Sequence, residues 1–163
     1  MAIRPIHSPP RESSRTAAAL EKNAPSHDKW LDDAEAALKS VEAFYFDATE
    51  GVRALVSKDG KISSALLERE QHAAHGLSWL ATYVQAVREM IAYARRMEQE
   101  GKLGETEVLL TRIGLSEYVA QIFGGIPMSQ GEMVRLNQLG VPAPDAARFA
   151  ADTAVATLID TGT

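Results

Sequence analysis

Two histidines and a glutamate share one face of the segment LEREQHAAHGLSW. Glu68, His72 and His75 follow one another at steps of four and three, the spacing that brings side chains together on a helix surface. Imidazole nitrogens and carboxylate oxygens bind divalent transition metals, so this face is a candidate metal site. The structural alternative pairs Glu68 with His72 and has His75 hydrogen-bonded beside Trp79 and Tyr83. We favour that alternative and predict no metal, because no second helix carries the matching Glu-x-x-His pair of di-iron bundles.

A second candidate site lies where the run AQIFGGIPMSQGE stops at a double glycine. Gly124 and Gly125 tolerate positive φ and have no side chain that would hold a neighbour away. The pair therefore suits the C-cap of a helix, and it equally suits a backbone that closely approaches a phosphate-bearing cofactor. Both interpretations use the same property of glycine, so the residues themselves leave the choice open.

Composition restricts the classes of partner. The 163 residues, with 45% hydrophobic and 24% charged residues, suit one ordinary globular domain. A formal net charge of −5 provides no basic surface for nucleic acid. The chain has no cysteine, which removes disulfides and cysteine-based zinc sites and fits the reducing cytoplasm, the location we expect. No apolar run approaches the ~20 residues of a membrane span, so we predict neither nucleic acid nor membrane as a partner.

Apolar residues recur every three or four positions through most of the chain, and no strand-like alternation of useful length accompanies them. The prediction is an all-α bundle of about five helices, which fills the domain 28–163 and follows an extended N-terminal arm at 1–27. Ser129 followed by Glu132 has the spacing of a capping box, which predicts that the fourth helix begins there. The five helices are expected at about 28–55, 64–100, 105–123, 129–140 and 144–160.

The expected helix at 64–100 carries two neighbouring apolar stripes, and two stripes need two partners. One of these stripes includes Trp79, Tyr83, Met90 and Tyr93. We predict that these four residues contact a second copy of the chain or another domain, because large exposed apolar patches are unusual on soluble monomers. The alternative is that all four belong to the chain's own core.

The stretch VAQIFGGIPMSQGEMVR resembles the flavin-contacting segment of acyl-CoA dehydrogenases, in which a helix ends in a glutamine, two apolar residues and a double glycine. In that family the segment belongs to the C-terminal four-helix bundle and meets the adenosine-pyrophosphate part of FAD across a subunit interface. The resemblance implies a similar bundle here and assigns FAD contact to Gln121, Gly124 and Gly125. The stretches EREQHAAHGLSWLATYV and GGIPMSQGE look similar to the helical N-terminal extension of the family's methylsuccinyl-CoA dehydrogenase branch.

This resemblance implies a noncatalytic accessory domain that packs and assembles with the catalytic body of an FAD-dependent acyl-CoA dehydrogenase, an oxidoreductase. The family's middle β-domain, its other flavin-binding segments and its catalytic glutamate motif have no counterpart in these 163 residues. We therefore expect no catalytic residue and no tightly bound cofactor in this chain alone, with FAD held by the full-length enzyme. Two alternatives stay open: a free-standing helical dimerisation or adaptor module, and a metal-binding bundle.

Overall fold

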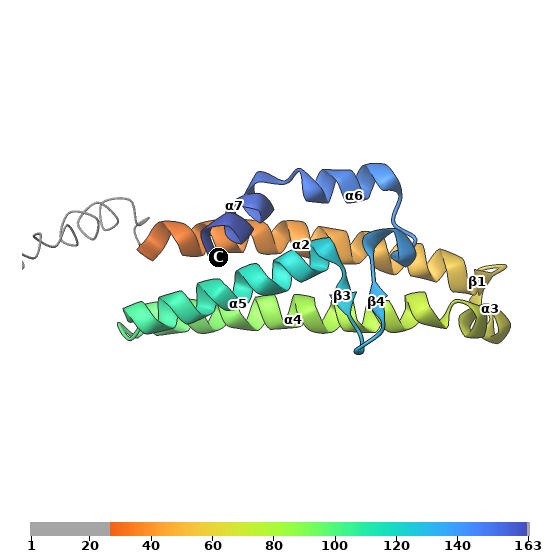
Figure 1. Ribbon diagram of the computed structural model, residues 1–163, viewed down its shortest axis with the longest axis horizontal. Helices are drawn as coiled ribbons and strands as arrows, with labels where there is room; N and C mark the ends of the chain where they lie inside the picture. Colours follow the sequence, from red (N-terminus) through yellow and green to blue (C-terminus); the bar gives the residue numbers. More distant parts are fainter. Residues whose placement is uncertain (1–26, 163) are drawn as a thin grey trace, which may run out of the picture.

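Helices dominate the computed structural model, which describes residues 27–162. The all-α prediction is confirmed for these residues, which form six α-helices, a short 3₁₀ helix and two small hairpins. Three long helices run side by side along the molecule, and the short helices α6 and α7 return along the first of them (Figure 1). The helices are α2 (His27–Val56), α3 (Ser64–Arg69), α4 (Gln71–Gln99), α5 (Glu105–Gly124), η2 (Leu136–Leu139), α6 (Ala143–Ala150) and α7 (Thr153–Gly162).

The hairpins close two of the connections between helices. β1 (Ser57–Lys58) pairs antiparallel with β2 (Lys61–Ile62), and β3 (Ile126–Pro127) pairs antiparallel with β4 (Met133–Val134).

Of the predicted N-terminal arm, residues 1–26 lie outside the described part of the chain, whereas His27 already belongs to α2. No helix among the described residues is both long and apolar enough to cross a membrane.

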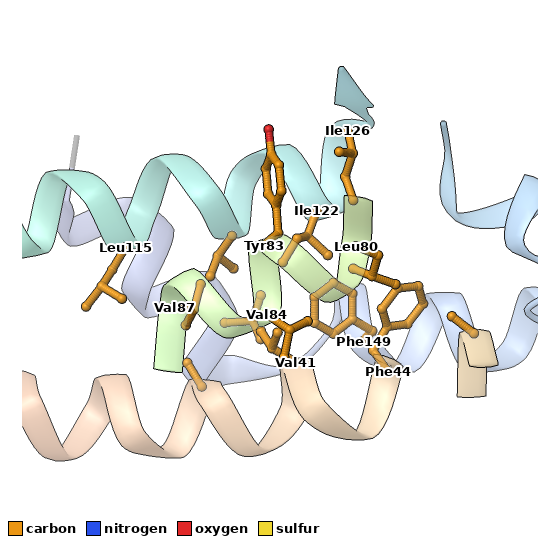
Figure 2. Packing of buried hydrophobic residues seen from close by; sticks show 14 of the residues in the cluster. Val41, Phe44, Leu80, Tyr83, Val84, Val87, Leu115, Ile122, Ile126 and Phe149 are labelled. Carbon is orange, nitrogen blue, oxygen red and sulfur yellow. The ribbon is translucent and has the colours of Figure 1, made fainter. Parts of the chain in front are cut away.

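The core forms where α2, α4 and α5 bury their apolar faces against one another. Figure 2 shows α2 contributing Val41 and Phe44, and α4 contributing Leu80, Val84 and Val87. These residues recur at steps of three and four, so each helix presents one continuous apolar face. Burial of these faces supplies the main driving force for packing the long helices together.

Polar contacts at the surface join α2 to α4. Arg95 of α4 donates to Glu35 of α2 at 2.7 Å and to Asp32 of the same helix, and it also donates to Glu98 at 2.9 Å. Hydrogen bonds from the guanidinium, first to Glu35, then to Glu98 and Asp32, raise the pKa of Arg95. One cation of α4 therefore joins two carboxylates of α2 and one carboxylate of its own helix.

The expected helix at 64–100 is divided, so its prediction as one continuous helix was wrong. α3 ends at Arg69 and α4 begins at Gln71, while Glu70 between them has φ −100° and ψ 23°. α3 has no buried residue, so no core packing holds it in line with α4. Because neither glycine nor proline stands at this position, the sequence carried no signal for the division.

The prediction of a fourth helix at 129–140 was also wrong, because that segment contains β4 and the short 3₁₀ helix η2 and no α-helix. Ile126 of β3 pairs with Val134 of β4, and both side chains are fully buried. Val134 packs against Gly76 of α4, where an added Cβ would lie 2.9 Å from the Val134 Cβ. The hairpin therefore buries its apolar side chains against α4 at the place where Gly76 has no side chain. The free energy of that burial exceeds the contribution of a capping box, so the segment does not form an α-helix.

The expected fifth helix is divided into α6 and α7 by an aspartate. Asp152 Oδ1 accepts the backbone N–H groups of Ala154 at 2.9 Å and Val155 at 3.1 Å, as an N-cap residue does. Its other oxygen accepts the Ser40 hydroxyl of α2 at 2.6 Å. An aspartate before the run TAVATLI is typical of a helix start, so the prediction of one continuous fifth helix was wrong at this residue.

Candidate functional site

Helix α5 ends at the double glycine, and the two glycines have different surroundings. Gly125 has φ 127° and its N–H donates to the Gln121 carbonyl at 2.8 Å. A Cβ at this position would meet the Met133 side chain of β4, with the Met133 Cγ 2.8 Å away. Gly124 is exposed, and no atom lies within 4 Å of the place where its Cβ would be. The helix-end interpretation therefore accounts for Gly125, while Gly124 presents open backbone that a ligand could approach.

Gln121 lies one turn before the glycines and is held by a tyrosine from the neighbouring helix. The Tyr83 hydroxyl of α4 donates to the Gln121 Oε1 at 2.6 Å. The rings of Tyr83 and Tyr118 pack at a tilt, with centroids 4.7 Å apart. Burial first, and the neighbouring Tyr118 second, raise the pKa of Tyr83. Figure 2 shows the Tyr83 hydroxyl pointing away from Val41 and Val84. The amide oxygen of Gln121 thus already has a partner within the chain.

A largely apolar groove of about 360 Å³ borders Gly124. Its walls come from the end of α5, from η2 and from the start of α6; they are Phe123, Gly124, Arg135, Leu136, Asn137, Val141, Ala143 and Ala146. Arg135 is the one cation in this lining, and an arginine beside open backbone is a suitable partner for a phosphate. The lining contains no carboxylate, histidine or hydroxyl that could act as a base or nucleophile. The groove could contact part of a dinucleotide, but it provides no catalytic group.

These residues fit FAD only in part. Gly124 and Arg135 offer an approachable backbone and a cation. Gly125 is accounted for by Met133, and the Gln121 oxygen is occupied by Tyr83. A complete flavin site would also need groups that enclose the isoalloxazine ring, and this lining provides none. FAD contact by Gln121, Gly124 and Gly125 accordingly stays a prediction for an assembled protein.

The histidine face is divided by the break at Glu70, because Glu68 lies on α3 whereas His72 and His75 lie on α4. The Trp79 indole N–H donates to His75 Nε2 at 3.0 Å, as the structural alternative proposed for this histidine. Glu132, in the turn between β3 and β4, lines an open hollow together with both histidines. Among the described residues, however, no three His, Asp or Glu side chains are grouped so that they could hold a metal ion.

The four residues predicted to contact a partner differ in their exposure. Tyr83 is buried within the chain, and Trp79 and Met90 are half-buried and pack against the core. Tyr93 remains 39% exposed, and the Arg96 guanidinium lies 5.6 Å from its ring centroid. Contact with a partner stays a prediction for these positions, and Tyr93 offers most of the surface for it.

The sequence reasoning missed an apolar surface on α5. Leu109, Leu110 and Ile113 are 49%, 65% and 51% exposed, whereas Val108 and Leu115 of the same helix are buried. The predicted apolar face of this helix contained Val108 and Leu115 and left out the three exposed residues. The signal was present, since the run EVLLTRIGL places apolar residues around most of the helix circumference.

Comparison with known proteins identifies one informative relative. No family model matches the chain. The chain is 52% identical over 105 residues to (2S)-methylsuccinyl-CoA dehydrogenase of Cereibacter sphaeroides. The match covers 64% of this chain and 19% of that protein, so the chain spans about a fifth of the length of the relative. This similarity supports the resemblance to the acyl-CoA dehydrogenase family, while a position in an N-terminal extension remains a prediction.

Proposed function

We propose that this chain is a noncatalytic helical domain that packs and assembles with the catalytic body of an FAD-dependent, methylsuccinyl-CoA dehydrogenase-like protein. The observation that carries the proposal is the match itself, because 52% identity over 105 residues includes only 19% of the dehydrogenase. A match of that length supports one domain of the dehydrogenase rather than a whole flavoenzyme. A cytoplasmic location belongs to the same proposal and fits the cysteine-free sequence.

Support also comes from the chemistry of the candidate site. The groove beside Gly124 has a cation and apolar walls but no base or nucleophile, so the chain has a surface for contact rather than a reaction centre. The double glycine is accounted for in part by packing against Met133. We therefore propose that FAD is held by the catalytic body, and that Gln121, Gly124 and Gly125 contribute at most a peripheral contact to it.

Two measurements test the proposed function. The purified chain alone should show no flavin absorbance and no oxidation of methylsuccinyl-CoA. Co-expressed with the part of the Cereibacter sphaeroides dehydrogenase that lies outside the match, it should co-purify as a flavin-containing complex. Stoichiometric flavin with turnover in the chain alone would refute the noncatalytic assignment. Absence of any complex after co-expression would refute the assembly role.

A second candidate function, a free-standing dimerisation or adaptor module, is favoured by the exposed apolar residues of α5. A second copy of the chain could cover them, and twofold dimers are the commonest homo-oligomers. Light scattering of the chain across a range of concentrations separates this candidate from the first. A monomer at all concentrations excludes self-association, whereas a concentration-dependent dimer favours the second candidate.

A further inference from the structure

Helix α5 is apolar on two faces, and the chain covers one of them. Val108, Leu115 and Val119 point into the core and are buried. Leu109, Leu110 and Ile113 point outward and keep about half or more of their surface exposed. A helix that is apolar around its circumference is typical of one covered on every side. The outward residues therefore indicate that a second covering surface is missing from the isolated chain.

The outward face of α5 borders a hollow and is not a flat apolar surface. Leu109 and Ile113 line a hollow of about 340 Å³ together with Arg112 and the end of α7 at Thr161 and Gly162. Arg112 donates to the Thr161 carbonyl, so its guanidinium already has an acceptor within the chain. A hollow with apolar walls accepts an apolar or aromatic side chain, the kind of anchor that dominates the energy of protein interfaces.

The surface extends onto the neighbouring helix. A Cβ at Gly114 of α5 would lie 2.9 Å from the Met90 sulfur of α4, so these two residues face each other across the antiparallel helix pair. One turn after Met90 and one turn before Gly114, Tyr93 of α4 therefore lies at the level of Leu110 of α5. Tyr93 is 39% exposed. Glu117, exposed on α5 one turn beyond Ile113, begins a polar rim of the kind that surrounds apolar interface centres.

We propose that Leu109, Leu110, Ile113 and Tyr93, together the α5 docking surface, are covered by the catalytic body of the dehydrogenase. This inference rests on the proposed function and adds to it the surface that makes the contact. The length of the matched dehydrogenase indicates what covers this surface. About four fifths of that protein lies outside the match, which is enough polypeptide to cover a long helix. The exposed leucines and isoleucine require an apolar face on that body, because a charged face would be desolvated without a partner.

Matched substitutions in the co-expressed complex test the surface. Leu110→Glu and Phe46→Glu each introduce one carboxylate at a position that is 65% exposed in the chain, the first on α5 and the second on α2. Circular dichroism and thermal melting of each variant chain should match the unsubstituted chain, because neither side chain is buried. Affinity for the catalytic body should fall about tenfold or more for Leu110→Glu. For Phe46→Glu it should stay within about twofold.

Because the chain has no cysteine, thiol labelling provides a second measurement that does not require a substitution to weaken the complex. Leu110→Cys and Phe46→Cys each create a single thiol, which a maleimide should label at similar rates in the isolated chain. In the complex, labelling at position 110 should slow about tenfold or more while labelling at position 46 stays unchanged. Mass spectrometry of the labelled peptide reports each site separately from cysteines of the catalytic body.

The outcomes separate this inference from the proposed function. If no complex forms with the unsubstituted chain, the proposed function fails and the inference fails with it. If the complex forms but position 110 stays accessible and Leu110→Glu binds normally, the α5 docking surface is refuted and the proposed function stands. If position 110 is protected in the isolated chain in a concentration-dependent way, a second copy is the occupant and the catalytic body is excluded.

Discussion

The Tyr83 hydroxyl donates a 2.6 Å hydrogen bond to the Gln121 amide oxygen and so joins α4 to the last turn of α5. The same glutamine is the residue for which the family resemblance implies flavin contact. Tyr83 is buried, so its hydroxyl needs a partner inside the protein. The bond therefore gives Gln121 a structural role in this chain whether or not it also meets FAD.

Tyr83→Phe should lower the free energy of unfolding by about 1 kcal/mol, because it removes the hydrogen bond and leaves the Gln121 oxygen without this donor. Urea denaturation followed by circular dichroism measures the change. Tyr93→Phe is the control, since it removes a hydroxyl from a partly exposed side chain on the same helix and should change stability by less than about 0.5 kcal/mol. Equal effects of the two substitutions would contradict a structural role for the Tyr83–Gln121 pair.

The Asp152 cap should make the stability of the chain depend on pH. The Ser40 hydroxyl first, with the Ala154 and Val155 N–H groups, lowers the pKa of Asp152 against the opposing effect of burial. A lowered pKa in the folded state means that Asp152 stabilises the fold above its unfolded pKa of about 3.9. That contribution is lost as the pH falls below about 4 and the carboxylate becomes protonated.

Asp152→Asn keeps a capping side chain but cannot ionise, so it should reduce stability at pH 7 by at most about 1 kcal/mol and flatten the dependence of stability on pH below about 5. Denaturant titrations at a series of pH values measure both effects. Asp160→Asn, an exposed carboxylate of α7, serves as the control for a change of charge on the same helix. A variant at position 152 that keeps the full acid dependence would show that other carboxylates control it.

The Arg95 network should contribute modestly to stability and should weaken in salt. Arg95 bonds to Asp32, Glu35 and Glu98, and its side chain is 27% exposed. Networks around one arginine exceed isolated surface pairs, whose contributions are ~0–1 kcal/mol. Arg95→Met should cost about 1 kcal/mol at low ionic strength, and 1 M NaCl should reduce that cost. Arg53→Met, at an exposed pair with Glu50, should cost close to nothing in the same denaturation experiment.

Helical periodicity predicted the parts of the fold whose residues pack on one continuous face. α2 and α5 follow the expected ranges closely, because their buried positions repeat every three or four residues. The β3–β4 hairpin could not be predicted in that way, because its stability comes from contact between Val134 and Gly76, more than fifty residues apart. A local capping signal at Ser129 carries less free energy than burial of the hairpin's apolar side chains.

The local backbone geometry of the double glycine could be predicted from residue type, whereas its contact with FAD stays a prediction. The double glycine marks the end of α5, as the helix C-cap interpretation required. The partners of those residues, Met133 at Gly125 and Tyr83 at Gln121, come from other elements and leave no periodic trace in the sequence. Asp152 is the opposite case, since an aspartate before an apolar run is a recognisable helix start, and it divides the predicted fifth helix.

The two glycines at the end of α5 should respond oppositely to alanine. Gly125→Ala should destabilise the chain by about 2 kcal/mol or more, because φ is 127° and the new Cβ meets Met133. Gly124→Ala should be neutral or stabilising by up to about 1 kcal/mol, because that residue is helical, exposed and has no atom near its Cβ position. Denaturation of the isolated chains measures both values.

Gly124→Ala also separates a flavin contact from a helix end, because the substitution leaves the fold of the isolated chain intact. In the co-purified complex, the ratio of flavin to protein absorbance should fall if FAD approaches the Gly124 backbone, since a methyl group would occupy that space. Ala120→Gly, one turn earlier on α5, controls for a change in helix propensity at the same end of the helix. Unchanged flavin content and affinity in Gly124→Ala would limit the double glycine to ending α5 and would remove Gly124 from the predicted FAD contacts.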